Sequence, residues 1–119
     1  MTEAQRQPAP EVFTSARDYI ARYGDQIDRI GAPRGSYFCA VLGPKPFSFE
    51  QRSLPVYAVH DPYYRYRLLD LPPGVAIHTG IIAPWFGFPG GARQVLFQLG
   101  DILLSAEECL QLNILEGAA

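Results

Sequence analysis

Proline and glycine clusters divide the middle of this chain into short segments. The segments between them are rich in aromatic and β-branched residues, which favour strands. They lie at residues 36–42, 54–59, 63–69, 74–84 and 93–99. Residues 64–67 alternate tyrosine with arginine, which places the two residue types on opposite faces of a strand. Strands at such short intervals favour an antiparallel sheet over alternating strand–helix–strand units.

Helical patterns lie at both ends of this strand-rich region. Apolar and aromatic residues recur with helical spacing early in the chain, at Phe13, Ala16, Tyr19, Ile20 and Tyr23. Thr14 or Ser15 can cap the start of this helix, and Gly24 can end it. Near the other end, Ser105 and Glu108 match the capping box S-x-x-E. We therefore predict an α+β fold: a compact, mostly antiparallel twisted β core with an N-terminal helix and a short C-terminal helix.

The chain length of 119 residues predicts one domain with one hydrophobic core. Residues 1–12 are predicted to form a flexible, polar N-terminal tail, and residues 13–119 the folded domain. The segment DRIGAPRG, residues 28–35, is predicted to be rich in turns. Neither an internal repeat nor a linker is visible in the sequence.

Composition excludes several classes of function. A net charge of -2 argues against a surface that binds nucleic acid, which would be basic. No apolar run approaches the roughly 18 residues of a transmembrane helix, so we expect no membrane insertion. The N-terminus lacks a basic region followed by an apolar stretch, so no signal peptide is visible in this chain.

Cysteine and histidine do not form a recognisable site. Cys39 and Cys109 lie far apart in sequence, and they form either one disulfide or two buried thiols. His78 lies in an apolar segment and is interpreted as structural, and His60 is the only other histidine. No cluster of three or four metal ligands is visible, so no metal site is expected. The standard nucleotide-loop, zinc-protease and serine-hydrolase motifs are also missing.

The stretch PWFGFPGGARQ, residues 84–94, sets aromatic residues against a glycine-rich loop that ends on Gln94. Glycine lets a backbone approach a ligand closely, and aromatic rings provide flat walls. Arg52, in the segment EQRSLP, offers a planar fork of donors that matches phosphate oxygens. Together these parts suit a dinucleotide, although Gly90-Gly91 alone also fits a hairpin turn, and Trp85 and Phe86 alone also fit a core.

An ordered series of short motifs strengthens the dinucleotide interpretation. The motifs are DRIG (28–31), GSYF (35–38), RSLP (52–55), YxYR (64–67), GIIAPWFG (80–87) and PGGARQ (89–94). A leucine-rich C-terminal helix follows them. This series resembles the tuberculosis necrotizing toxin (TNT) family of NAD glycohydrolase domains, over about three-quarters of the chain.

The resemblance implies an activity and a set of site residues. It implies that the chain cleaves NAD+ to nicotinamide and ADP-ribose without a bound cofactor, with NADP+ as a second candidate substrate. Arg52 and Gln94 match the essential arginine and glutamine of the family, and Tyr37 matches an aromatic that walls the nicotinamide. We expect Ile30, Trp85, Phe86, Gly90 and Gly91 to complete the substrate site. In this interpretation Arg52 holds the diphosphate, and Gln94 contacts the nicotinamide ribose or the attacking water.

The resemblance also implies a biological setting. Family members are toxin domains that are secreted or delivered into a target cell, and an inhibitory immunity protein is an expected partner. The chain departs from the family pattern at Ile30, Ala92 and Val95. Three alternatives stay open: an ADP-ribosyltransferase with the same pocket, an inactive module that binds a nucleotide or an immunity protein, and a structural domain of a larger secreted protein.

Overall fold

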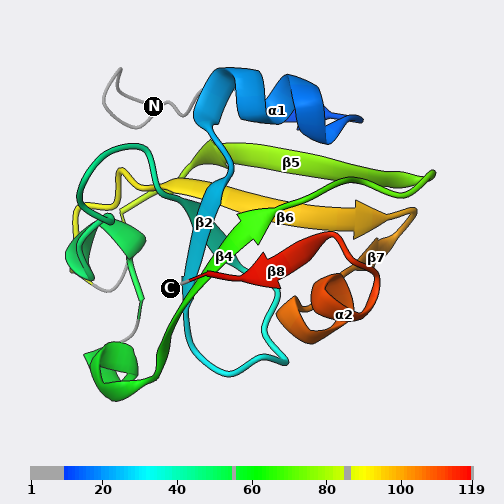
Figure 1. The fold of residues 1–119 in the computed structure, drawn as a ribbon. Helices are drawn as coiled ribbons and strands as arrows, with labels where there is room; N and C mark the ends of the chain where they lie inside the picture. Colours follow the sequence, from blue (N-terminus) through cyan, green and yellow to red (C-terminus); the bar gives the residue numbers. More distant parts are fainter. Residues whose placement is uncertain (1–9, 55, 85–86, 119) are drawn as a thin grey trace.

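An antiparallel sheet organises residues 10–54, 56–84 and 87–118, which this computed structural model describes (Figure 1). Its strands are β1 (Glu11–Phe13), β2 (Gln26–Ile30), β3 (Phe38–Ala40), β4 (Tyr63–Leu68), β5 (Val75–Ile81), β6 (Arg93–Leu99), β7 (Ile102–Leu103) and β8 (Leu115–Gly117). They follow the order β1-β5-β6-β3-β2-β4-β8, and β7 pairs with β6. Every pair is antiparallel, so the predicted α+β class with a mostly antiparallel sheet is confirmed.

The first helix, α1 (Ala16–Tyr23), begins and ends where its sequence predicts. The Ser15 hydroxyl accepts a hydrogen bond from the Asp18 amide at 3.2 Å, which satisfies one free N–H of the first turn. Gly24 ends the helix with a φ of +83°, and its N–H donates to the carbonyl of Ile20. Tyr19 is fully buried and meets the ring of Phe13 edge to face, which joins α1 to β1.

The second helix, α2 (Ala106–Gln111), confirms the predicted capping box. The Glu108 amide donates to the Ser105 hydroxyl at 3.1 Å, and the Ser105 amide donates to the Glu108 carboxylate at 2.9 Å. The chain then enters β8, which pairs with β4 at one edge of the sheet.

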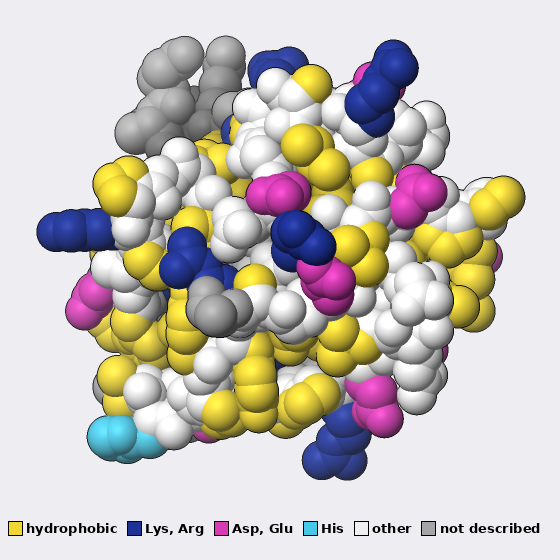
Figure 2. All heavy atoms as spheres, in the orientation of Figure 1, with side chains coloured by type: hydrophobic (Ala, Val, Ile, Leu, Met, Phe, Trp, Pro, Cys, Tyr) yellow, Lys and Arg dark blue, Asp and Glu magenta, His cyan; other side chains and the backbone are white. Residues whose placement is uncertain are grey.

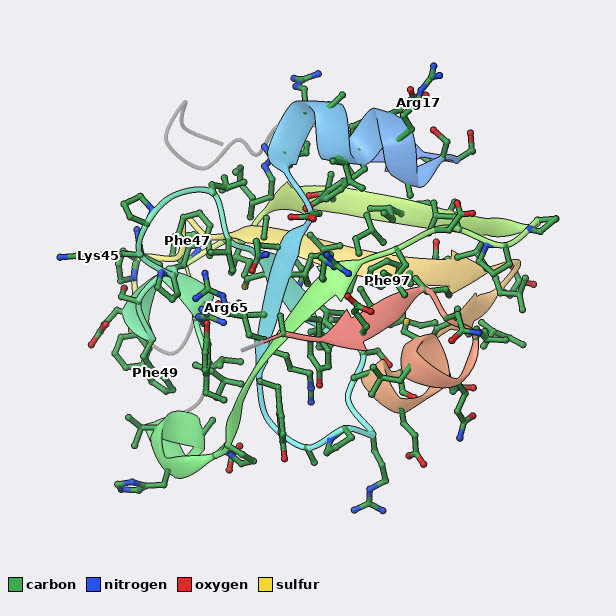
Figure 3. All side chains as sticks on the ribbon, in the orientation of Figure 1. Arg17, Lys45, Phe47, Phe49, Arg65 and Phe97 are labelled. Carbon is green, nitrogen blue, oxygen red and sulfur yellow. The ribbon has the colours of Figure 1, made fainter. Side chains whose placement is uncertain are left out.

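The core is built from the alternating inward side chains of the central strands. Phe38 meets Phe97 and Tyr66 edge to face, at centroid distances of 5.3 and 5.9 Å. Figure 3 shows Phe97 in the interior, whereas Arg17 projects from α1 into solvent. Each large apolar side chain that is fully buried contributes roughly 1.5–3 kcal/mol to folding. Successive side chains of β6 point to opposite faces of the sheet, and Val95 and Phe97 point into the core. Gln94 therefore lies on the opposite face.

Three sequence predictions need correction. The predicted strand at 54–59 is instead a 3-10 helix, η3 (Val56–His60); its sequence follows Pro55, which has no N–H for a strand ladder. The predicted turn region at 28–35 begins inside β2, because β3 and β4 pair with it from both sides. Residues 11 and 12 were assigned to the tail, yet they pair with β5 as part of β1. A strand of three residues such as β1 is too short to show an alternating pattern in the sequence.

The face of the molecule in Figure 2 shows no single dominant charge. On the face in Figure 2, lysine and arginine side chains alternate with aspartate and glutamate rather than forming a basic patch. None of the helices in the described ranges is long and apolar enough to cross a bilayer. Within the same ranges, no group of three or more histidine, cysteine, aspartate or glutamate side chains is placed to hold a metal ion.

Both cysteines are buried free thiols, which decides between the two alternatives left open above. Burial raises the pKa of Cys39 and of Cys109 to about 12. Because the thiolate is the reactive form, we expect neither cysteine of the native protein to react with iodoacetamide near neutral pH. Both should react once urea unfolds the chain, as mass spectrometry of the alkylated protein would show. Rapid labelling of either thiol in the native protein would contradict this arrangement.

Candidate functional site

A row of three side chains crosses the middle of the sheet and connects the predicted site residues. Asp28 of β2 is paired with Cys39 of β3, and Cys39 is paired with Gln94 of β6. Directly paired residues point to the same face, so these three side chains share the face opposite the aromatic core. Two strand spacings separate the backbones of Asp28 and Gln94, which corresponds to about 10 Å.

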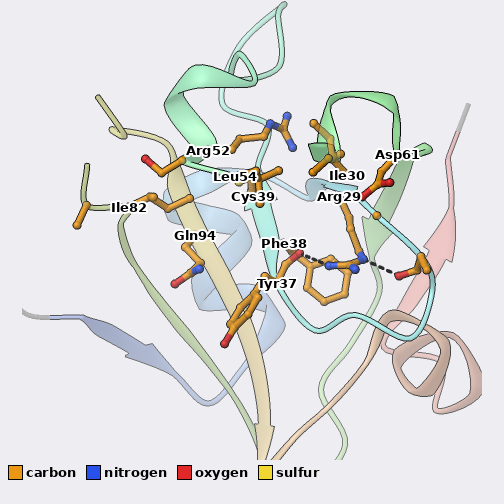
Figure 4. Close-up of a pocket in the computed structure, with 15 residues that line it drawn as sticks. Arg29, Ile30, Tyr37, Phe38, Cys39, Arg52, Leu54, Asp61, Ile82 and Gln94 are labelled. Atoms are coloured by element: carbon orange, nitrogen blue, oxygen red, sulfur yellow. Dashed lines mark hydrogen bonds between the residues drawn. The ribbon is translucent and has the colours of Figure 1, made fainter. Parts of the chain in front are cut away.

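A cavity of about 600 Å³ lies beside this row (Figure 4). Its lining includes Ile30, Tyr37, Arg52 and Gln94, four of the predicted site residues. Figure 4 shows Gln94 and Tyr37 on one side, and Ile30 on the other. The volume lies within the usual range for small-molecule sites. The fold thus brings Arg52 and Gln94 together although they are distant in sequence.

The glycine loop supports the cavity wall rather than lining the cavity. Gly90 has a φ of +71°, and a Cβ atom there would lie 2.8 Å from the Ala83 carbonyl group and closer still to the Ile82 oxygen. The Gly91 amide donates to the Ile82 carbonyl at 2.9 Å. Ile82 and Ala83 both line the cavity, whereas neither glycine does. Trp85 and Phe86, also predicted for this site, lie outside the described residues.

This loop offers a matched pair of substitutions. We expect Gly90→Ala to destabilise the protein more than Gly91→Ala, because both positions have positive φ but only Gly90 adjoins backbone atoms. Backbone strain alone costs on the order of 1–2 kcal/mol, and the steric overlap at Gly90 adds to it. Urea unfolding of the two variants measures the difference. Equal midpoints would show that the loop is not held against Ile82.

Arg52 is buried and almost fully engaged by protein groups. Its side chain is 3% exposed, and its Nη1 and Nη2 atoms each donate to Asp28 at 2.8 Å. Nε and Nη2 also donate to the Phe47 carbonyl, at 3.1 and 3.0 Å. A guanidinium has five N–H groups, so these contacts leave one, on Nη1. Among the described contacts Arg52 therefore keeps one free N–H at the cavity lining, not the open fork predicted from its sequence context.

The electrostatics of Arg52 follow from the Asp28 contact. Burial alone would lower the pKa of Arg52, but the hydrogen bonds and the charge of Asp28 outweigh it, so that the pKa is raised. Tyr63 donates from its hydroxyl to the Asp28 carboxylate at 2.8 Å. Burial, reinforced by that hydrogen bond, raises the pKa of Tyr63 to about 12. The carboxylate thus holds both neighbours in their protonated forms.

Arg29 is a cavity residue that the sequence prediction missed. Its Nε donates to the Ala32 carbonyl and its Nη1 to the Tyr37 carbonyl, both at 2.9 Å (Figure 4). Its Nη2 atom lies where a Cβ of Gly35 would be. Burial lowers the pKa of Arg29, and no carboxylate in the described ranges forms an ion pair with it. Arg29 thus brings a positive charge to the cavity without an ion pair in the described ranges, although the nearby Asp61 partly offsets the effect of burial on its pKa. The absence of a side chain at Gly35 makes room for its guanidinium.

Gln94 is held by its backbone and leaves its side chain available. The Thr79 hydroxyl donates to the Gln94 carbonyl oxygen at 2.6 Å, and β6 is paired on both sides at this position. Within the described part of the chain, no hydrogen bond engages the side-chain amide of Gln94. An amide offers both a donor and an acceptor, which suits a ribose hydroxyl or a water.

The sequence of this chain is similar to known proteins over most of its length. A family model described as tuberculosis necrotizing toxin matches residues 21–117, a range that includes Arg29, Tyr37, Arg52 and Gln94. The outer membrane channel protein CpnT of Mycobacterium tuberculosis is 36% identical over 104 residues, and so is CpnT of Mycobacterium bovis. These alignments cover 87% of this chain but only 12% of each relative.

A solved structure has the same fold. It contains tuberculosis necrotizing toxin complexed with its immunity factor IFT, and it matches with a TM-score of 0.87 and 31% sequence identity. The match covers 97% of this chain and 58% of the solved chain. The shared architecture therefore extends over the described sheet and both helices.

Proposed function

This chain belongs to the tuberculosis necrotizing toxin family, and on that premise we propose that it is an NAD+ glycohydrolase toxin domain. The observation that carries the proposal is the convergence of Arg52 and Gln94 on one cavity, with Tyr37 and Arg29 beside them. NADP+ is a second possible substrate, because it carries the same nicotinamide–ribose bond.

The proposed reaction needs no strong nucleophile. The bond between nicotinamide N1 and ribose C1′ breaks, and nicotinamide leaves as a neutral molecule with the bonding electrons. A water oxygen forms the new bond at C1′ and gives one proton to solvent, so that the products are nicotinamide, ADP-ribose and H+. The transition state resembles the oxocarbenium ion of glycoside hydrolysis. The protein must therefore orient the substrate, tolerate positive charge at the sugar and admit one water.

We assign these tasks to the cavity residues as follows. Arg29 binds the diphosphate, because its charge is not neutralised by an ion pair in the described residues. Arg52 keeps a catalytic role with a single oriented N–H, while Gln94 orients the ribose or the water. Tyr37 is exposed at the cavity and packs against the nicotinamide ring, and Ile30 forms an aliphatic wall. Gly90 and Gly91 act indirectly, by holding the wall in place.

Hydrolysis is preferred over transfer of ADP-ribose to a protein. A transferase commonly relies on a glutamate that activates the acceptor. Among the described residues that line the cavity, Asp61 is the only carboxylate, and it is exposed. Water is therefore the better supported acceptor.

The toxin proposal includes a partner and a place of action. An enzyme that destroys NAD+ would harm the cell that makes it, so an inhibitory immunity protein should bind this domain. The solved relative is complexed with its own immunity factor, which supports that expectation. Action inside a target cell, after secretion or delivery as part of a larger protein, completes the proposal.

Product analysis tests the proposed activity. Purified protein is incubated with NAD+ labelled in its adenylate half, and the products are separated by chromatography. Equimolar nicotinamide and free ADP-ribose support a glycohydrolase. Label that moves onto protein would indicate a transferase, and binding of NAD+ without turnover would indicate an inactive module. Neither binding nor turnover would leave a structural domain.

A further inference from the structure

We infer that Asp28 and Tyr63 are positioning residues for Arg52. They fix its guanidinium so that one N–H faces the cavity, while the Asp28 carboxylate neutralises the positive charge of the guanidinium. This role deepens the proposed NAD+ hydrolysis and rests on it.

The ion pair is closed off from solvent. The Asp28 side chain is fully buried, and both of its oxygens receive a hydrogen bond from Arg52. Together with the Phe47 carbonyl, they fix the plane of the guanidinium from two sides. Rotation of Arg52 would break several charge-assisted hydrogen bonds at once, so its remaining N–H points in a single direction.

Tyr63 completes the arrangement from the start of β4. Its hydroxyl donates to Oδ2 of Asp28, the oxygen that also accepts from Nη2 of Arg52. Its ring centroid lies 5.8 Å from Cζ of Arg52, within the range of a cation–π contact. Tyr63 thus orients the carboxylate and covers one side of the guanidinium.

Pairing of Arg52 with Asp28 reduces electrostatic repulsion in the proposed reaction. The nicotinamide ring is cationic before cleavage, and the ribose becomes cationic as the bond breaks. A free guanidinium in the cavity near the ribose would repel both states, and low local dielectric would strengthen the repulsion. Paired with Asp28, Arg52 supplies a directed hydrogen bond and little net charge. The anion-binding task then falls to Arg29, which has no such pair in the described residues.

Tyr63→Phe tests the inference, with Tyr64→Phe as its control. Tyr64 is the next residue on β4 and is exposed to a similar degree, 38% against 45%, but no hydrogen bond within the described ranges uses its hydroxyl. We expect Tyr63→Phe to lower kcat for NAD+ about tenfold and to change KM less than about twofold. Tyr64→Phe should leave both constants unchanged. Tyr63→Phe loses a hydrogen bond to the buried Asp28 carboxylate, so its melting temperature should fall, and both variants are assayed at a temperature at which their melting curves show them folded.

A second measurement reports on the mobility of the Arg52 guanidinium and does not require the protein to turn over NAD+. In nitrogen-15 spectra of the wild-type protein, the Arg52 Nη protons should be resolved, because rotation of the guanidinium is restricted. They should broaden in Tyr63→Phe and stay sharp in Tyr64→Phe. Unchanged Arg52 signals or an unchanged kcat in Tyr63→Phe would overturn the positioning role. A wild-type protein that shows the expected spectra but does not hydrolyse NAD+ would instead reject the proposed function.

Discussion

Replacement of Gln94 by alanine should reduce the rate of nicotinamide release by ~10²-fold or more, the loss typical of a group that acts in the transition state. The side-chain amide lines the cavity, and no hydrogen bond from the described residues occupies it. The strand itself should be retained, because the backbone of Gln94 is paired on both sides and Thr79 binds its carbonyl. Initial rates with NAD+, measured beside a melting curve, separate loss of chemistry from loss of fold.

Gln98→Ala is the matched control for that prediction. Gln98 lies on the same strand and the same face as Gln94 and is also half-buried, but it does not line the cavity. It should retain the wild-type rate. A loss of less than about threefold in Gln94→Ala, or equal losses in both variants, would remove Gln94 from the reaction.

The largest effect on stability should come from breaking the buried ion pair. Arg52→Ala leaves the Asp28 carboxylate fully buried without its cation, which typically costs about 3–5 kcal/mol. We expect a corresponding fall in the urea midpoint. The Asp28→Asn/Arg52→Ala double variant should be less destabilised than the sum of its single variants, because it leaves no buried charge unpaired.

A surface ion pair calibrates this expectation. Arg67 and Glu116 pair across β4 and β8 with side chains that are 50% and 43% exposed. Arg67→Ala should therefore cost only about 0–1 kcal/mol. If Arg52→Ala and Arg67→Ala shift the urea midpoint equally, Asp28 and Arg52 do not form a buried ion pair in solution. Activity of Arg52→Ala must be measured where the variant is still folded.

The features that the sequence predicted well are local ones. The Ser15 cap, the Gly24 stop and the Ser105–Glu108 capping box each depend on residues within one helical turn, and all are confirmed. The strand at residues 93–99 was also correct, because its β-branched and aromatic residues follow a glycine loop that bounds the strand. The error at residues 54–59 has the opposite origin, since β-branched and aromatic composition there gave no information on hydrogen-bonding partners.

The site itself depends on pairings that no local pattern specifies. The sequence motifs selected Arg52 and Gln94, but neither motif shows that they share a cavity. The register of β2, β3 and β6 aligns Gln94 with Asp28, and the ion pair with Asp28 holds Arg52, from the 3-10 helix Glu50–Arg52, beside the same cavity. The same register places Asp28 under Arg52, so that the open fork predicted from the sequence is largely occupied. Arg29 was missed because its segment was interpreted as turns, whereas it lies on β2.

The most direct test of the proposed site is a crystal structure of Gln94→Ala with intact NAD+. We predict that the diphosphate lies against Arg29, that the nicotinamide ring packs on Tyr37, and that ribose C1′ lies within reach of position 94. Arg52 should still be bound to Asp28. NAD+ bound elsewhere on the surface, or a cavity that stays empty at saturating NAD+, would contradict the assignment of this cavity as the catalytic site.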